Sequence, residues 1–293
     1  MGYILQNSNL KIQIDAPFEC YQGSRFDWTG KISEVIYHGI TLTRSEKPDS
    51  RNEDQIGKGL YNEFGIATAL GFEEAEKGGW FHKIGVGLLK KDGDSYLFHK
   101  PYTIDPAHFD FLQGPDRVTV LCTSKDVNGY AYVLRKDIEL QESGFAIHYH
   151  LVNTGEKEIH TSEYVHNFLG IDRDPIGPHY AVEFPFPLSP DLFEETVNPE
   201  GKAVLGQNQV SFKASPKDQF FFSPLNGNTR AEAGWTLTHR SQGIRLSESG
   251  SFQTDKVNLW GWTHVISPEL FHTISLMPGQ STTWSRTYQV LSI

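Results

Sequence analysis

The stretch that decides the fold reads FAIHYHLVNTGEKEIHTSEYVHNF and spans residues 145–168. Its first half alternates apolar and polar side chains as far as Leu151, as expected of a β-strand with one buried face. Asn153, Thr154 and Gly155 then form a turn signal, because Asn bonds locally and glycine tolerates positive φ. The second half ends near His166, with aromatic residues at 164 and 168. The stretch therefore predicts a strand-turn-strand unit that delivers a histidine between aromatic rings.

The same alternation recurs along most of the chain, and Gly, Asn, Asp and Pro interrupt it at short intervals. Residues 63–77 are the best helical candidate, but Gly65 and Gly71 weaken it. Further strands are expected at residues 10–14, 31–37, 118–123, 132–140, 219–222, 235–239, 272–276 and 283–290. Many short strands without a long linker predict an all-β fold, a large antiparallel sandwich that forms one domain over residues 1–293.

Two segments break this rhythm. Residues 44–79 are polar, charged and punctuated by glycine, and residues 172–200 are rich in Pro, Phe and acids. Loops of that length inside a compact domain are usually functional or mobile. Because rigid strands carry loops at the rim of a sandwich, we expect both segments to be walls of a binding cleft.

The composition excludes several classes of protein. The formal net charge is −10 and no Lys/Arg-rich run occurs, which argues against nucleic acid or an anionic membrane as the main partner. Residues 1–15 do not resemble a signal peptide, and no apolar run is long enough to cross a bilayer, so we expect a cytoplasmic protein. Cys20 and Cys122 stand apart, and we expect two reduced thiols that fill core space.

A carboxylate far along the chain completes the chemistry of the histidine. Glu269 lies in the apolar run VISPELF, residues 265–271, where removal from water would raise its pKa. Together with His166 it forms an acid–base pair that works near neutral pH without a cofactor or metal. Trp260 and Trp262 lie just before it on one strand face and suit either a core or the apolar face of a sugar ring. Asn167, next to the histidine, is a further candidate for binding substrate.

Two glycine-bounded stretches add polar candidates. In QGSRFDWTG, residues 22–30, Arg25 either pairs internally with Asp27 or offers its donors to ligand hydroxyls. In GGWFHKIGVG, residues 78–87, His82 and Lys83 are candidate donors to an oxygen-rich ligand, since no helix follows to make a phosphate loop. Glu63 is another polar candidate for the same ligand.

A metal site is the less favoured alternative. His148 and His150 share one strand face, and the His-x-His pattern also occurs in cupin metal sites, which add a glutamate and a later histidine. His160 and His166 follow, but Glu156 lies past the turn and does not fit that spacing. We therefore expect two half-exposed histidines on a sheet. A serine or cysteine nucleophile has no support either, because Gly-x-Ser-x-Gly and Cys-x-x-Cys are absent.

Taken in order, these pieces resemble the aldose 1-epimerase (galactose mutarotase-like) family. Three places carry the resemblance, which covers most of the chain. They are the glycine-rich early region with His82, the LVNTG strand of residues 151–155 followed by YVHNF at 164–168, and SPE at 267–269 before LMPGQ at 276–280 and Trp284.

The resemblance implies a β-supersandwich with a sugar site on its concave face. It also implies that His166 is the general acid, Glu269 the general base, and His82 a ligand of the ring oxygen or a hydroxyl. An arginine of an early loop is expected to reach the sugar, and either Arg25 or Arg51 suits that role. The implied reaction is the interconversion of the α and β anomers of an aldose without a cofactor, in a monomer or homodimer. The family's Asn-Arg-Ile and His-Gly-Gly signatures are missing from this chain.

Two other functions fit the same residues. One is a non-catalytic carbohydrate-binding protein on the same scaffold. The other is a sugar isomerase or lyase that acts on an acidic or phosphorylated sugar, for which the substrate anion needs a basic cluster. That cluster can come from Arg44, Lys47, Arg51, Lys58 and Lys83.

Overall fold

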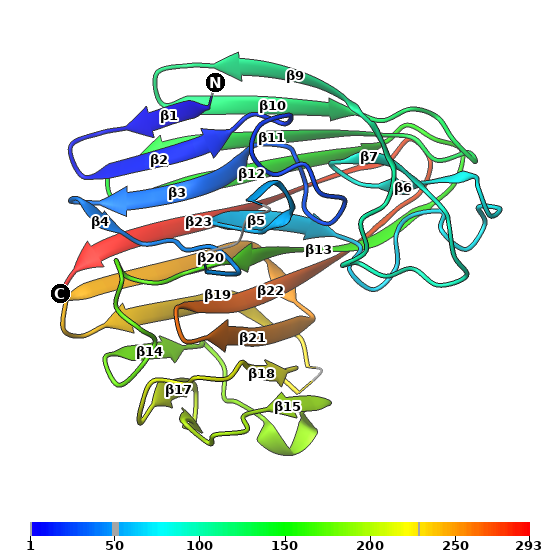
Figure 1. The fold of residues 1–293 in the computed structure, drawn as a ribbon. Coiled ribbons are helices and arrows are strands. Elements are labelled where there is room, and N and C mark those ends of the chain that lie inside the picture. The colour runs from blue at the N-terminus through cyan, green and yellow to red at the C-terminus, as the bar shows by residue number, and fades with distance from the viewer. Residues whose placement is uncertain (1, 49–52, 228) are drawn as a thin grey trace.

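The computed structural model describes residues 2–48, 53–227 and 229–293. Within these residues, two antiparallel sheets of ten strands each pack face to face, and a three-stranded sheet lies at one end (Figure 1). Sheet 1 contains β1 (Tyr3–Gln6), β2 (Leu10–Asp15), β3 (Lys31–Tyr37), β5 (Leu60–Phe64), β13 (Ile159–Asn167), β22 (Val265–Leu276), β21 (Lys256–Trp262), β18 (Phe220–Ser223) and β15 (Glu195–Val197), with β4 (Ile40–Thr41) paired to β3.

Sheet 2 lies behind sheet 1 and sheet 3 beside both. Sheet 2 contains β16 (Ala203–Leu205), β17 (Gln209–Phe212), β14 (Tyr180–Glu183), β19 (Ala231–His239), β20 (Ile244–Thr254), β23 (Ser281–Ser292), β12 (Gly144–Asn153), β11 (Tyr132–Gln141), β10 (Arg117–Thr123) and β9 (His108–Gln113). Sheet 3 contains β6 (Trp80–Lys83), β7 (Gly87–Lys90) and β8 (Ile104–Pro106). The predicted all-β antiparallel architecture is confirmed, and each predicted strand lies in or overlaps an observed one.

Alternation along the strands decides which side chains form the core. In β10, Val118, Val120 and Cys122 are fully buried, whereas Thr119 and Leu121 between them are partly exposed. The same pattern in both large sheets builds one apolar core between them. Cys122 fills the core as expected, but the free thiol of Cys20 is exposed, so that part of the prediction is wrong.

The predicted loop at residues 44–79 is wrong at its centre, because β5 lies there, between β3 and β13. All five residues of β5 are buried, and this removes the polar–apolar contrast that marks a half-exposed strand. Gly59 and Gly65 flank the strand at φ +62° and +61°. A Cβ at Gly59 would lie 2.1 Å from the carbonyl oxygen of Ile32, so the close approach of β3 and β5 requires glycine there.

The second predicted loop, residues 172–200, contains β14, β15 and a 3₁₀ turn, η2 (Pro190–Leu192). The helical candidate at residues 63–77 is also wrong, since the only helical elements in the described residues are η2 and η1 (Glu53–Gln55). Accordingly, no helix in the described residues is long and apolar enough to span a membrane.

A buried ionic cluster joins the two large sheets. Arg286 on β23 bonds Glu163 on β13 through Nε at 3.1 Å and a terminal nitrogen at 2.7 Å. Its other terminal nitrogen donates to Glu248 on β20, and the terminal nitrogen that bonds Glu163 also donates to the carbonyl of Leu270 on β22. All three charged residues are at most 2% exposed. The guanidinium therefore bridges sheet 2 and sheet 1 directly behind the strands that carry the candidate site.

Candidate active site

Two neighbouring strands of sheet 1 bring His166 and Glu269 together. β13 pairs antiparallel with β22, and a bridge just beyond joins Leu169 to Ile266. His166 lies three residues before Leu169, and Glu269 lies three residues after Ile266. The antiparallel register therefore places His166 and Glu269 opposite each other. Imidazole Nε2 lies 3.4 Å from Oε1 of the carboxyl group. Both residues are 4% exposed, so the pair is nearly removed from water.

The imidazole ring is held by a stacked ring on one face, by an edge contact and by a hydrogen bond at its second nitrogen. The Phe168 ring stacks on it with centroids 3.9 Å apart and planes 12° apart, and the Trp260 ring meets it edge-on at 5.3 Å. The Ser267 hydroxyl lies 2.8 Å from Nδ1 and 3.4 Å from Oε1 of Glu269. Sequence reasoning missed this serine. Its position two residues before the carboxylate, on the same strand face, is the signal that identifies it.

Burial shifts both members of the pair toward their neutral forms. Removal from water raises the pKa of Glu269 to about 7. Burial, assisted by the positive charge of Arg25, holds the pKa of His166 well below its usual range. Near neutral pH the two groups therefore share at most one titratable proton, counted beyond the N–H that a neutral imidazole always carries. With one proton on two adjoining sites, one group can donate while the other accepts.

A second buried cluster is centred on Glu63 of β5. Arg25 donates to Oε2 at 2.8 Å, and the Tyr164 hydroxyl donates to the same oxygen at 2.7 Å. Lys83 of sheet 3 donates to Oε1 at 3.2 Å and to the Tyr96 hydroxyl at 2.8 Å. Although burial opposes its charge, Lys83 and Arg25 lower the pKa of Glu63. The carboxylate is thus a fixed negative charge held by two cations.

Tyr164 connects the two clusters. Its ring centroid lies 6.1 Å from that of His166, on the same face of β13. Arg25 donates to its hydroxyl at 3.1 Å. The structure therefore brings Arg25, Glu63 and Lys83 close to the acid–base pair, as candidates for binding the hydroxyl groups of a ligand.

The expected internal pair of Arg25 and Asp27 does not form. Asp27 instead binds Lys136 of β11 at 2.6 Å. The guanidinium of Arg25 lies over the rings of Phe26 and Phe98, at 4.5 and 4.7 Å from their centroids. Planar cations are well suited to such aromatic faces. The partners of Arg25 come from distant parts of the chain, which local spacing does not reveal.

The structure does not bring His82 to the pair. Neighbouring residues of β6 point to opposite faces, so Lys83 reaches Glu63 while His82 points away. The imidazole of His82 is fully buried, and its Nε2 lies 3.2 Å from the carbonyl oxygen of Val127. Burial lowers its pKa, which keeps the ring neutral. Its contacts are those of a core residue.

Asn167 also points away from the pair, because it follows His166 on β13 and so faces the opposite side. Its amide nitrogen donates to the carbonyl of Pro268 at 2.7 Å and to Glu248 at 3.0 Å. The hydroxyl of Tyr288 donates to its oxygen at 3.0 Å. Asn167 therefore belongs to the buried cluster between the sheets and ties β13 to β22 behind the site.

The two tryptophan candidates differ in their distance from the acid–base pair. Trp260 borders the imidazole, whereas Trp262, on the same face of β21, donates to the carbonyl of Lys217 at 2.7 Å and lies nearer the end of the strand. Both indoles are partly exposed. Arg51 lies outside the described residues.

The strand histidines form no metal centre with their neighbours. On β12, His148 is exposed and His150 partly exposed. In the parts of the chain that the structure describes, no three or more His, Cys, Asp or Glu side chains are grouped to hold a metal ion.

The fold defined by the two large sheets is that of galactose mutarotase-like proteins. A galactose mutarotase related enzyme from Lactobacillus acidophilus is similar with a TM-score of 0.60 and 11% identity, over 100% of this chain and 98% of that one. A galactose mutarotase-like protein from Clostridium acetobutylicum gives 0.59 and 15%, over 99% and 95%. A proposed aldose 1-epimerase from Escherichia coli K12 gives 0.64 and 12%, over 100% and 99%.

These likenesses are structural. No protein-family model matches the chain, and no curated protein matches it in sequence. At such identities the neighbours show the fold, and the chemistry has to be argued from the side chains of this chain.

Proposed function

We propose that this protein interconverts the α and β anomers of an aldose, with His166 and Glu269 as the proton-transferring pair. The observation that carries the proposal is their 3.4 Å separation in a buried, aromatic-lined position on one face of sheet 1. The names of the structural neighbours support the same activity. Trp260 offers an apolar surface beside the pair, and Glu63 with its two cations offers hydrogen-bonding groups for hydroxyls.

The reaction needs two proton transfers at adjacent oxygens. Ring opening takes a proton from the O1 hydroxyl, forms the C1=O1 double bond, breaks the C1–O5 bond and places a proton on O5. Because O1 and O5 are bonded to the same carbon, the two protein groups must themselves be close together. Protonated His166 donates to O5 while the Glu269 carboxylate accepts from O1. Rotation about C1–C2 then presents the other carbonyl face, and the reverse transfers close the ring.

The proton count of the free protein matches this requirement. Burial favours a neutral imidazole beside a carboxylic acid, which carries the same single proton as an imidazolium beside a carboxylate. Binding of sugar therefore calls for transfer of one proton across the pair, without uptake from water. Each group contributes roughly 10²–10⁴-fold to the rate in transfers of this kind.

The direct test is the equilibration of freshly dissolved α-galactose and α-glucose, followed by polarimetry or proton NMR. We expect catalytic amounts of the protein to accelerate the exchange above the buffer rate. Sugar binding by calorimetry without any acceleration would instead identify a non-catalytic carbohydrate-binding protein.

The activity should fall as the pH rises through about 7, the raised pKa of Glu269. Above that value Glu269 loses its proton while His166 stays neutral, so the pair has no donor. Below the lowered pKa of His166 both groups are protonated and no acceptor remains. We therefore expect kcat/KM, corrected for the buffer-catalysed rate, to be highest in slightly acidic solution. A profile that stays level through neutrality contradicts this assignment.

Ser267 is expected to act as a positioning residue for the pair. Ser267→Ala removes the hydroxyl that holds Nδ1 of His166, and we expect kcat to fall roughly tenfold, as for a lost buried hydrogen bond. Ser267→Thr keeps the hydroxyl on a residue suited to strands and should restore most of the rate. Equal rates in the wild type and the alanine variant would show that the contact is not used.

A further inference from the structure

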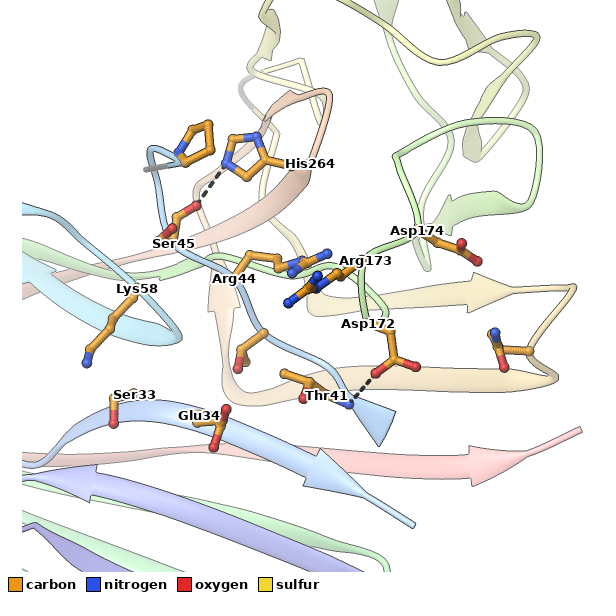
Figure 2. A pocket seen from close by; sticks show the side chains of 13 residues that line it. Ser33, Glu34, Thr41, Arg44, Ser45, Lys58, Asp172, Arg173, Asp174 and His264 are labelled. Atoms are coloured by element: carbon orange, nitrogen blue, oxygen red, sulfur yellow. Dashed lines mark hydrogen bonds between the residues drawn. The ribbon is translucent and has the colours of Figure 1, made fainter. Parts of the chain in front are cut away.

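A large cavity lies apart from the acid–base pair. Its volume is about 1180 Å³, and it is lined by neither His166 nor Glu269 nor the residues of the Glu63 cluster. Arg44 and Lys58, two of the residues that the sequence offered for binding a substrate anion, do line it. It is formed by the outer face of β3, the segment that follows β4, the segment that follows β13, and the end of the β21–β22 hairpin (Figure 2). The ionisable side chains that line it are Arg44, Lys58, Arg173, His264, Glu34, Asp172 and Asp174.

Two guanidinium groups meet in this cavity without a carboxylate in direct contact with either. Figure 2 shows the ends of Arg44 and Arg173 beside each other, and the charge of Arg173 acts on Arg44. No carboxylate in the described residues comes within 4.0 Å of either guanidinium, and Nε of Arg44 is buried without a hydrogen-bond partner. Burial lowers the pKa of Arg44; the negative charge of Asp172 opposes this shift, and the like charge of Arg173 adds to it. Such a pair is incompletely satisfied and attracts an anion.

The neighbouring acidic groups do not neutralise these arginines. Asp172 accepts the backbone N–H of Thr41 at 2.9 Å, and Asp174 lies 3.4 Å from Nε2 of His239. In Figure 2 both carboxylates point away from the two guanidinium groups, and Glu34 lies apart from them on β3.

The backbone around Arg44 holds its side chain in place. Its N–H donates to the carbonyl of Phe168 at 2.7 Å, and its carbonyl accepts from Gly59 at 2.9 Å. The side chain then crosses Gly170, where an added Cβ would lie 2.8 Å from Cγ of Arg44. The lack of a side chain at Gly170 thus leaves the space that the arginine occupies. A cation fixed in advance loses little freedom when it binds a ligand.

We propose that Arg44 and Arg173 form a binding site for a phosphate group carried by a small solute. Two guanidiniums match the double charge of phosphate and supply forked donors for its oxygens. The cavity is large enough to hold the remainder of the solute, such as a monosaccharide, beside the phosphate. The site does not rest on the proposed anomer exchange, because it is lined by different residues and binding is measured without turnover.

The test is the binding of inorganic phosphate to the whole chain by calorimetry, with phosphorus NMR line width as a second readout. We expect Arg173→Gln and Arg44→Gln each to raise the Kd by roughly tenfold or more. Arg230→Gln is the matched control, since Arg230 is an exposed arginine paired with Asp255 elsewhere on the surface, and it should leave the Kd unchanged. Arg173 is exposed in a connecting segment, so its variant carries the test if the Arg44 variant does not fold.

A second series of binding measurements, with glucose 6-phosphate and galactose 6-phosphate, distinguishes a sugar phosphate from free phosphate as the ligand. Tighter binding of either ester than of inorganic phosphate, lost in the same arginine variants, identifies a sugar phosphate; equal or weaker binding identifies free phosphate. The proposal is overturned if the wild type binds neither the anion nor the esters, or if Arg44→Gln, Arg173→Gln and Arg230→Gln bind them equally. Loss of ester binding only in His166→Ala would also overturn it, because that places the ligand at the other site.

Discussion

Glu269→Gln and His166→Ala are each expected to slow anomer exchange by roughly 10²–10⁴-fold, because each removes one of the two proton-transfer partners. Glutamine keeps the shape of the carboxylate and can still contact Asn258 and Ser267, but it cannot exchange a proton near neutral pH. The rate is measured by polarimetry at saturating sugar, and the affinity by calorimetry. The affinity should change far less than the rate.

The control for this pair is Glu156→Gln, which makes the same chemical change at an exposed residue of the β12–β13 turn. It should leave the exchange rate unaltered. If both site variants instead keep wild-type rates, the pair is not catalytic, and the sugar-binding alternative becomes the better account.

Glu269→Gln has a second expected effect, on stability. Burial raises the pKa of Glu269 from 4.5 to about 7 in the folded protein, so the protonated form favours folding. That contribution is fully present below pH 4.5 and is lost as the pH rises through about 7. In slightly alkaline solution the variant should therefore be more stable than the wild type, by up to about 3 kcal/mol. Urea unfolding midpoints compared at acidic and alkaline pH measure this, and a pH-independent difference would contradict it.

Arg286→Leu is the second change with a large expected effect, and it acts on folding. The substitution leaves Glu163 and Glu248 buried between the sheets without their shared cation. Breaking a buried ion cluster from one side typically costs roughly 3–5 kcal/mol, because the remaining charges are uncompensated. The free energy of unfolding, measured by urea titration, should fall by that amount.

Arg117→Leu is the matched control for this experiment. Arg117 pairs with Glu139 on the exposed side of sheet 2, and such surface pairs contribute about 0–1 kcal/mol. Nearly equal losses in the two variants would mean that the interior cluster contributes no more than a surface contact.

The sequence allowed the fold class to be predicted because most strands have one buried face. Residues 118–123 alternate between buried and partly exposed side chains and lie within β10. β5 was missed because neither of its faces is exposed: Asn62 bonds inside the sandwich, and Glu63 lies in the second buried cluster of the site. Where both faces of a strand are covered, its polar residues do not indicate which face meets solvent. The sequence pattern of such a segment therefore resembles that of a loop.

The candidate site was predicted in part. The residue pattern indicated His166 and Glu269, the resemblance assigned them their roles, and their closeness follows from the register of β13 and β22. Period-two geometry also argues against Asn167 as a neighbour in the site, since consecutive strand residues face opposite ways. The contacts of Arg25 with Glu63, 38 residues away, depend on how loops and sheets pack, and no local pattern carries that information.

The alternation of β13 has a practical consequence for anyone who redesigns this protein. His166 lies on one face of the strand. On the other face, its neighbour Asn167 donates a hydrogen bond to the carbonyl of Pro268, one residue from Glu269. The spacing of the two reactive groups is therefore set in part by a hydrogen bond on the opposite, buried face of β13 and β22. A mutant library confined to the residues that contact the acid–base pair would leave that hydrogen bond untouched, and with it an independent means of adjusting the proposed turnover.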